Sequence, residues 1–207
     1  GAQIVNGMIF GIKGKKVSAV KEGKKLSRSV YESATSWLSA YKKTNDMSLE
    51  DEKYFWKRIS KIVMGGSTQY KEAKKKGADI TAFQKEMNSK LSNLGVSWNK
   101  NDKKKTQKSA EEYYSDVFKE AKKYFENYES EHKVSLQQEK YYWEQVKKHT
   151  EAGTQGYYDA AKKVKAVQKE IDKEVKNNKA KQKEKEQARS ESKLSNSDKL
   201  IGDYKMY

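Results

Sequence analysis

The amino-acid sequence predicts an all-α protein of tandemly repeated antiparallel helical hairpins and long charged helices, elongated and without a β-sheet. Three observations lead to this prediction. The 207 residues include no proline, where average usage would give about ten, so no helix is forced to break. Charged residues make up 36% of the chain and hydrophobic residues only 34%, which is typical of helices with a narrow apolar stripe. A long segment of the chain also occurs twice.

The first segment, residues 1–28, predicts a basic amphipathic helix that contains glycine. Gly7 and Gly11 stand four residues apart, a spacing that lets two helices approach closely. We expect this helix to pack on a partner or on a second copy of the chain. A helix lying on a membrane surface and a flexible tail are the alternatives. The candidate oligomer contact consists of Ile4, Gly7, Met8, Gly11 and Ile12.

The repeat becomes visible when the chain is shifted by 87 residues, because residues 30–76 then align with residues 117–163 without a gap. Tryptophan, glycine and tyrosine fall in register, which shared lysine and glutamate content alone does not explain. We therefore predict one helical repeat unit over residues 29–107 and a second over residues 108–196.

Each unit is expected to contain three helices joined by short turns. Ser48 and Ser135 each precede an apolar helical pattern and act as predicted N-caps, and Ser135 with Gln138 forms a capping box. Gly66 and Gly153 are the predicted glycine caps at the other end of these helices. Because the joints are short, neighbouring helices fold back antiparallel.

Two aromatic triplets lie in the middle of the capped helices. We interpret them as anchors that hold each hairpin together, since aliphatic residues are few and aromatic burial has to supply most of the core. A platform for stacking nucleic-acid bases is the alternative. The six packing anchors are Tyr54, Phe55, Trp56, Tyr141, Tyr142 and Trp143.

The end of the chain is strongly polar. Residues 177–192 contain only two apolar side chains. This pattern predicts either a solvated helix or a disordered segment. Residues 197–207 are expected to begin a further unit, because Asp203 follows Asp116 at the repeat distance. This suggests that the sequence is a fragment of a longer protein.

Charge and catalytic residues limit the function classes. The net charge is +16, yet only three of the 45 basic residues are arginine, which disfavours sequence-specific reading of DNA. The chain has no cysteine, and its two histidines do not stand at a metal-ligand spacing. We therefore expect no catalytic residue, no cofactor and no metal site, and do not expect an enzyme.

Two of these features together resemble phage tail tape measure proteins. In members from phages of Gram-positive hosts, a segment with Ile, Asn-Gly and Gly-Ile precedes a basic stretch, as it does here over residues 4–26. A repeated Ser-Leu, Glu and aromatic-Trp segment with a Gly-Ser or Gly-Thr turn also occurs in some members. Here that segment covers residues 48–76 and 135–163.

The resemblance implies a structural protein that sets tail length during tail assembly by the span of its helices. It further implies a homo-oligomer, a trimer or a hexamer, that docks in the tail tube or on distal-tail and tail-tip proteins. DNA or a membrane would be contacted transiently at ejection. The implied location is the virion, in the tail lumen or tail tip, and the host cytoplasm during assembly. The alternative function is a basic helical module that binds nucleic acid or an anionic membrane surface nonspecifically.

Overall fold

The computed structural model describes the backbone of residues 20–101 and 110–204. In these two ranges the fold is all-α, and no strand is present among the described residues. The helices are α2 (Val20–Thr44), α3 (Leu49–Ile62), α4 (Thr68–Asn101), α5 (Ala110–Glu131), α6 (Leu136–Lys148) and α7 (Gln155–Tyr204).

The helix bounds follow the repeat seen in the sequence. The first residues of α3 and α6, Leu49 and Leu136, are 87 residues apart. The first residues of α4 and α7, Thr68 and Gln155, are separated by the same distance. We call α2, α3 and α4 the first unit and α5, α6 and α7 the second unit.

Serine side chains begin the middle helix of each unit. The Ser48 hydroxyl accepts a hydrogen bond from the Asp51 amide at 3.1 Å, and the Ser135 hydroxyl accepts one from the Gln138 amide at 3.3 Å. In α6 the Gln138 side chain also accepts from the Ser135 amide, which completes the capping box. These bonds satisfy amide groups that have no partner inside the helix.

The two predicted glycine caps lie in the turns that follow the helices. The C-cap residues of α3 and α6 are Val63 and His149, whose amides already bond to Ile59 and Gln145. Gly66 and Gly153 come three and four residues later, with φ of 77° and 96°. The prediction placed the helix ends too late, because the positive φ serves the turn into the next helix.

Each unit has a core at which its three helices meet. In the first unit, Phe55 and Trp56 are buried beneath α2, with Ala34 fully enclosed. The equivalent residues of the second unit, Tyr142 and Trp143, are buried beneath α5. Successive helical residues point about 100° apart, so a triplet cannot face one core with all three side chains.

The prediction that Tyr54 is a packing anchor is therefore wrong, because its side chain is 40% exposed. The corresponding Tyr141 is partly buried, but it packs between the units, against α4. The remaining four predicted anchors, Phe55, Trp56, Tyr142 and Trp143, are at most 2% exposed.

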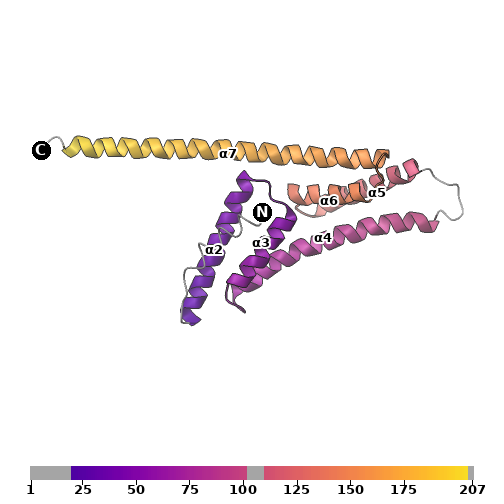
Figure 1. Ribbon diagram of the computed structural model, residues 1–207, viewed down its shortest axis with the longest axis horizontal. Coiled ribbons are helices and arrows are strands. Elements are labelled where there is room, and N and C mark those ends of the chain that lie inside the picture. Colours follow the sequence, from indigo (N-terminus) through magenta and orange to yellow (C-terminus); the bar gives the residue numbers. More distant parts are fainter. Residues whose placement is uncertain (1–19, 102–109, 205–207) are drawn as a thin grey trace.

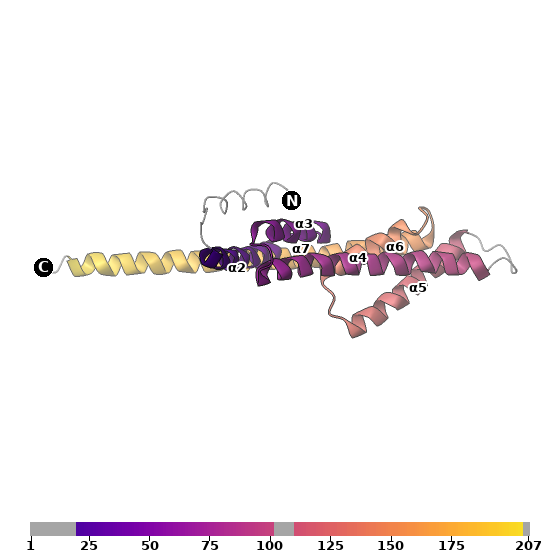
Figure 2. The ribbon, with the colours of Figure 1, turned by 90° about the horizontal axis from the view of Figure 1, so that it is seen from below.

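The molecule is elongated because α7 extends past the other helices (Figure 1). The first unit descends from α7 at an angle, and the far part of α4 runs back beneath α6. Turning the molecule shows α2, α4 and α7 nearly in one plane, with α3 and α5 on opposite sides of it (Figure 2). The predicted unit boundary at 196/197 lies inside α7, which continues to Tyr204.

Candidate functional site: interaction surfaces of the two units

The contact between the units is built on one face of α4. Phe83, Met87 and Leu91 stand at intervals of four residues and are 5%, 0% and 1% exposed. Residues at this spacing share one side of a helix. They join the core of the second unit, where the Phe83 ring lies 6.1 Å from that of Tyr128 and 6.2 Å from that of Tyr141. We call these three α4 residues the docking face.

Polar groups fix the register of the docked helix. The Tyr124 hydroxyl donates to Glu86 at 3.2 Å, and Asn88 Nδ2 donates to the Tyr141 hydroxyl at 3.1 Å. Lys90 Nζ lies 5.8 Å from the centre of the Tyr124 ring. Burial, with the nearby Glu86 carboxylate, raises the pKa of Tyr124 to about 12.

A second contact joins the units through the loop between α2 and α3. Lys140 of α6 and Gln168 of α7 donate to the same Asp46 carboxylate oxygen, at 3.2 Å and 3.1 Å. The pair is partly exposed, with 23% of the Lys140 side chain and 32% of the Asp46 side chain accessible. Such a pair contributes little stability, about 1 kcal/mol or less, but it does orient the loop.

The first unit carries the counterpart of the surface that α4 covers on the second. Trp37, Tyr41 and Tyr54 each stand 87 residues before Tyr124, Tyr128 and Tyr141. The Trp37 ring stacks on Tyr41 at 4.9 Å and on Phe55 at 5.6 Å. Arg58 lies 6.0 Å from the Tyr54 ring. We call Trp37, Tyr41 and Tyr54 the aromatic face of the first unit.

The docking face of α4 has no apolar counterpart on α7. The residues 87 positions after Phe83, Met87 and Leu91 are Glu170, Glu174 and Asn178. Both glutamates are exposed. The residue that corresponds to Asp46 is Lys133, so the sign of that loop charge is reversed. A further unit could not pack on α7 in the way that the second unit packs on α4.

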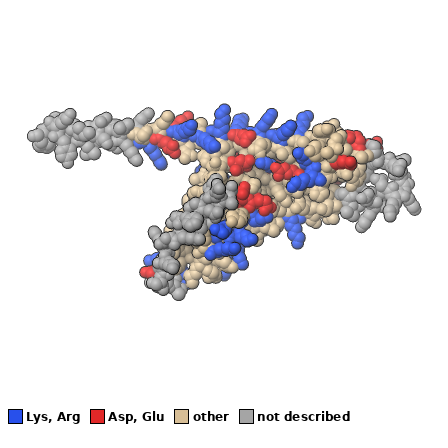
Figure 3. Space-filling view, in the orientation of Figure 1, with Lys and Arg blue, Asp and Glu red and all other residues tan. Residues whose placement is uncertain are grey.

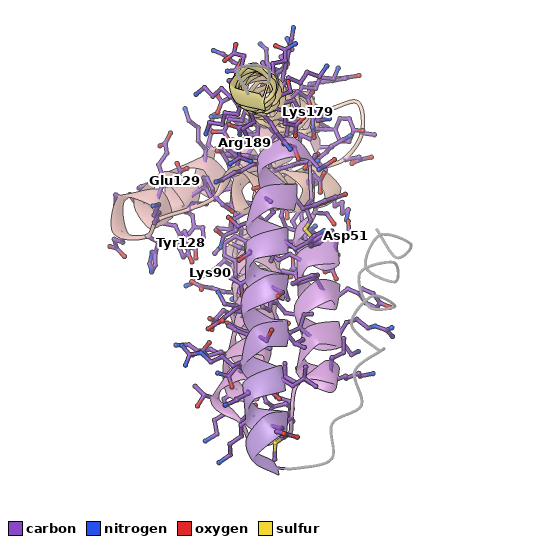
Figure 4. All side chains as sticks on the ribbon, turned by 90° about the vertical axis from the view of Figure 1, so that its left-hand side faces the viewer. Asp51, Lys90, Tyr128, Glu129, Lys179 and Arg189 are labelled. Atoms are coloured by element: carbon purple, nitrogen blue, oxygen red, sulfur yellow. The ribbon has the colours of Figure 1, made fainter. Side chains whose placement is uncertain are left out.

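Residues 179–190 of α7 are exposed on all sides of the helix and are largely charged. Residues 176–190 hold six basic and two acidic side chains. Figure 3 shows basic side chains along α7 with acidic ones between them. In Figure 4, α7 is seen nearly end-on, with Lys179 and Arg189 on it and with Lys90 and Tyr128 on the flank below.

Two open grooves lie between helices. One, of about 650 Å³, runs between α3 and α4 over Ala73, Gly77 and Ala78, and its edges carry Lys53 and Lys85. The other, of about 730 Å³, separates the hydroxyl-bearing back of α2 from the polar part of α7. Among the described residues that line these two grooves, lysine, small and hydroxyl side chains predominate.

Both histidines lie at the C-terminal ends of helices, His132 directly after α5 and His149 directly after α6. His132 Nδ1 lies 3.1 Å from the Tyr128 carbonyl oxygen, and its ring stacks on the Tyr128 ring at 4.2 Å. His149 is the C-cap of α6. Within the two described ranges, no three acidic or histidine side chains group as metal ligands would. No described helix combines the length and the apolar character needed to cross a bilayer.

The predicted oligomer contact, Ile4, Gly7, Met8, Gly11 and Ile12, lies outside the described residues. Sequence reasoning missed the docking face, although Phe83, Met87 and Leu91 show a plain four-residue spacing. The repeat does not reveal these three residues, because the residues 87 positions later are polar. The repeat does not indicate the contact of Asp46 either, because lysine replaces it in the second unit.

Comparison of the chain with family models, with curated proteins and with solved structures found no match.

Proposed function

We propose that this chain is a structural segment of a phage tail tape measure protein, which acts through its length and through helix docking. The observation that supports this best is α7, a single helix of 50 residues from Gln155 to Tyr204. At the rise of an α-helix it is about 75 Å long. A spacer requires such a span, and the absence of proline favours its continuity.

The repeated units fit the same role. A duplicated helical unit adds length in fixed steps, whereas an enzyme needs a defined cleft with shifted acid or base groups. In this proposal the chain is not catalytic and needs no cofactor. It forms a trimer or hexamer, meets tail-tube, distal-tail and tail-tip proteins, and resides in the tail lumen or tip after assembly in the host cytoplasm. DNA or membrane is met only at ejection.

Tail length in the parent phage tests the proposal. Removing residues 108–194, which is one repeat length of 87 residues, should shorten the tail by at most about 130 Å, the length of that many helical residues. Electron micrographs of assembled tails measure this change. A second deletion, of residues 176–189 in the polar part of α7, should shorten the tail by at most about 21 Å.

Tyr158→Ala is the matched control, because this side chain is 57% exposed and its loss changes no length. Assembled tails of unchanged length in both deletions would refute the ruler role. So would neighbouring genes that encode no tail-tube, chaperone or distal-tail protein.

A second candidate function has one observation in its favour, the basic part of α7. Six basic side chains on an exposed helix attract phosphate groups without reading sequence. If this is the function, the chain binds DNA or anionic vesicles with an affinity that falls steeply as salt rises. Replacing Lys179, Lys181 and Lys183 by glutamate should then abolish binding, while unchanged binding in that variant would exclude the basic stretch as the site.

A further inference from the structure

The aromatic face of the first unit is the counterpart of a surface that is covered on the second unit. All ring, cation and hydrogen-bond contacts that Trp37, Tyr41 and Tyr54 make within the described residues are to the first unit itself. On the second unit, the equivalent Tyr124, Tyr128 and Tyr141 pack beneath α4. Tyr54 is 40% exposed, and Trp37 and Tyr41 are partly buried, so this face is less covered than its counterpart on the second unit.

The occupant of this face has to resemble the docking face of α4. That face consists of apolar side chains at intervals of four residues along one helix. A second copy of the chain cannot provide it, because its α4 is already enclosed by its own second unit. Its α7 carries Glu170 and Glu174 at the corresponding places. Burying two carboxylates against aromatic rings is strongly unfavourable.

The N-terminal segment of the same chain carries the required pattern. Ile4, Met8 and Ile12 stand at the same four-residue intervals as Phe83, Met87 and Leu91. We infer that residues 4–12 dock as a helix on the aromatic face of the first unit, in the way that α4 docks on the second. This intramolecular contact does not depend on the proposed tail function.

The length of chain between the two partners allows this contact. Ile12 stands eight residues before Val20, the first residue of α2. The inferred contact replaces the single helix expected over residues 1–28 by a docked segment and an extended link, and a link of that length spans at most about 28 Å. Trp37 lies seventeen residues along α2, which corresponds to about 26 Å of helix. A segment that turns back along α2 can therefore reach Trp37 and pass it towards Tyr41.

The chain direction of residues 4–12 also matches that of α4 in the contact between the units. In the contact between the units, the earlier residue Phe83 meets Tyr128, whereas the later residue Lys90 meets Tyr124. The two helices thus run antiparallel. A segment that folds back from the start of α2 has the same antiparallel direction along that helix.

Cysteine cross-linking in the full chain tests this inference, since the natural sequence has no cysteine. The test variant carries Ile4→Cys and Tyr54→Cys. The control carries Ile4→Cys and Ser36→Cys, because Ser36 is exposed beside Trp37 but lines the groove towards α7. In dilute protein under a glutathione buffer, the test pair should form an intramolecular disulfide at least about tenfold more than the control pair.

A third variant shows whether docking causes this preference. Adding Met8→Lys to the test pair places a charge in the docked face and should lower its cross-linking to the level of the control. Ile4 and Met8 lie outside the described residues, so circular dichroism of each variant checks that the helical content of the natural chain is retained. The inference is overturned by a smaller preference for the test pair, by no effect of Met8→Lys, or by disulfide-linked dimers that increase with concentration.

Discussion

Gly156 at the start of α7 allows α5 and α7 to cross closely, and its replacement by alanine is the sharpest test of the second unit. A Cβ atom at this position would press on the carbonyl group of Tyr114 and lie 2.6 Å from its carbon. It would also lie 3.2 Å from the Ser115 nitrogen. These are backbone atoms, so no side-chain rotation can relieve the contact.

The expected cost follows from the distance. Non-bonded carbon atoms pack at about 3.5–4.0 Å, so α5 would have to move by about 1 Å. Overpacking of this kind destabilises proteins by about 1–3 kcal/mol. Alanine recovers part of this, up to about 1 kcal/mol, through its higher helix propensity. We expect Gly156→Ala to lower the free energy of unfolding by about 1–2 kcal/mol.

Gly77→Ala in α4 is the matched control, because both glycines are helical and neither has a positive φ. A Cβ atom at Gly77 would lie 3.8 Å from the Trp56 Cβ, which is an ordinary contact. Here the propensity gain is not opposed by overpacking. We expect this variant to be more stable than the natural chain by about 0.5–1 kcal/mol.

Thermal and urea unfolding, followed by circular dichroism, measures both changes. For a chain of this size, about 1–2 kcal/mol corresponds to a melting temperature about 2–8 °C lower. The two variants should therefore shift in opposite directions. If Gly156→Ala melts at or above the natural chain, the close crossing of α5 and α7 is wrong, and so is the account of the second unit that rests on it.

Three further changes test the cores and the docking contact. Met87→Glu places in the docking face the residue that α7 carries at the equivalent position. It should lower the free energy of unfolding by about 3–5 kcal/mol, and the two units should then unfold in separate urea transitions. Trp143→Ala removes a side chain that is 1% exposed; a loss of about 3–5 kcal/mol is expected, with faster amide exchange in α4 as well as α5. Tyr142→Phe removes the hydroxyl that donates to the Ala121 carbonyl at 2.7 Å and should cost about 1 kcal/mol at neutral pH. Because burial raises the pKa of Tyr142 above 10.0, its contribution is complete below pH 10 and is lost as the pH rises further. As the pH rises above 10, the Phe variant should therefore lose less stability in urea titrations than the natural chain does. Equal losses in the two proteins would contradict the raised pKa.

Local features of the fold could be predicted well because their causes are local. Ser48 and Ser135 cap helices through atoms three residues away, so the signal is contained in a few residues. The helical character of the chain followed from periodicity and the lack of proline. The prediction for Tyr54 is wrong because successive residues of a helix point in different directions, so adjacent aromatic residues do not share one core.

The arrangement of the units could not be predicted from the same signals. Docking depends on contacts between residues far apart in the chain, such as Phe83 with Tyr141 and Asp46 with Gln168. Repeat comparison hides such residues, because the two copies use them differently. The polar stretch after Val175 left two interpretations open. The structure has it as helix, with side-chain bonds such as Gln182 to Glu186 at 3.1 Å along its surface.

The change from Phe83 and Met87 to Glu170 and Glu174 has a consequence for the behaviour of many copies together. The two units contact each other head to tail, and a contact of that kind does not close on itself. If α7 kept the apolar pair, it could compete with residues 4–12 for the aromatic face of the next molecule, and the chain would grow into open filaments. The glutamates remove that end of the contact, so we expect that the repeat itself does not drive polymerisation.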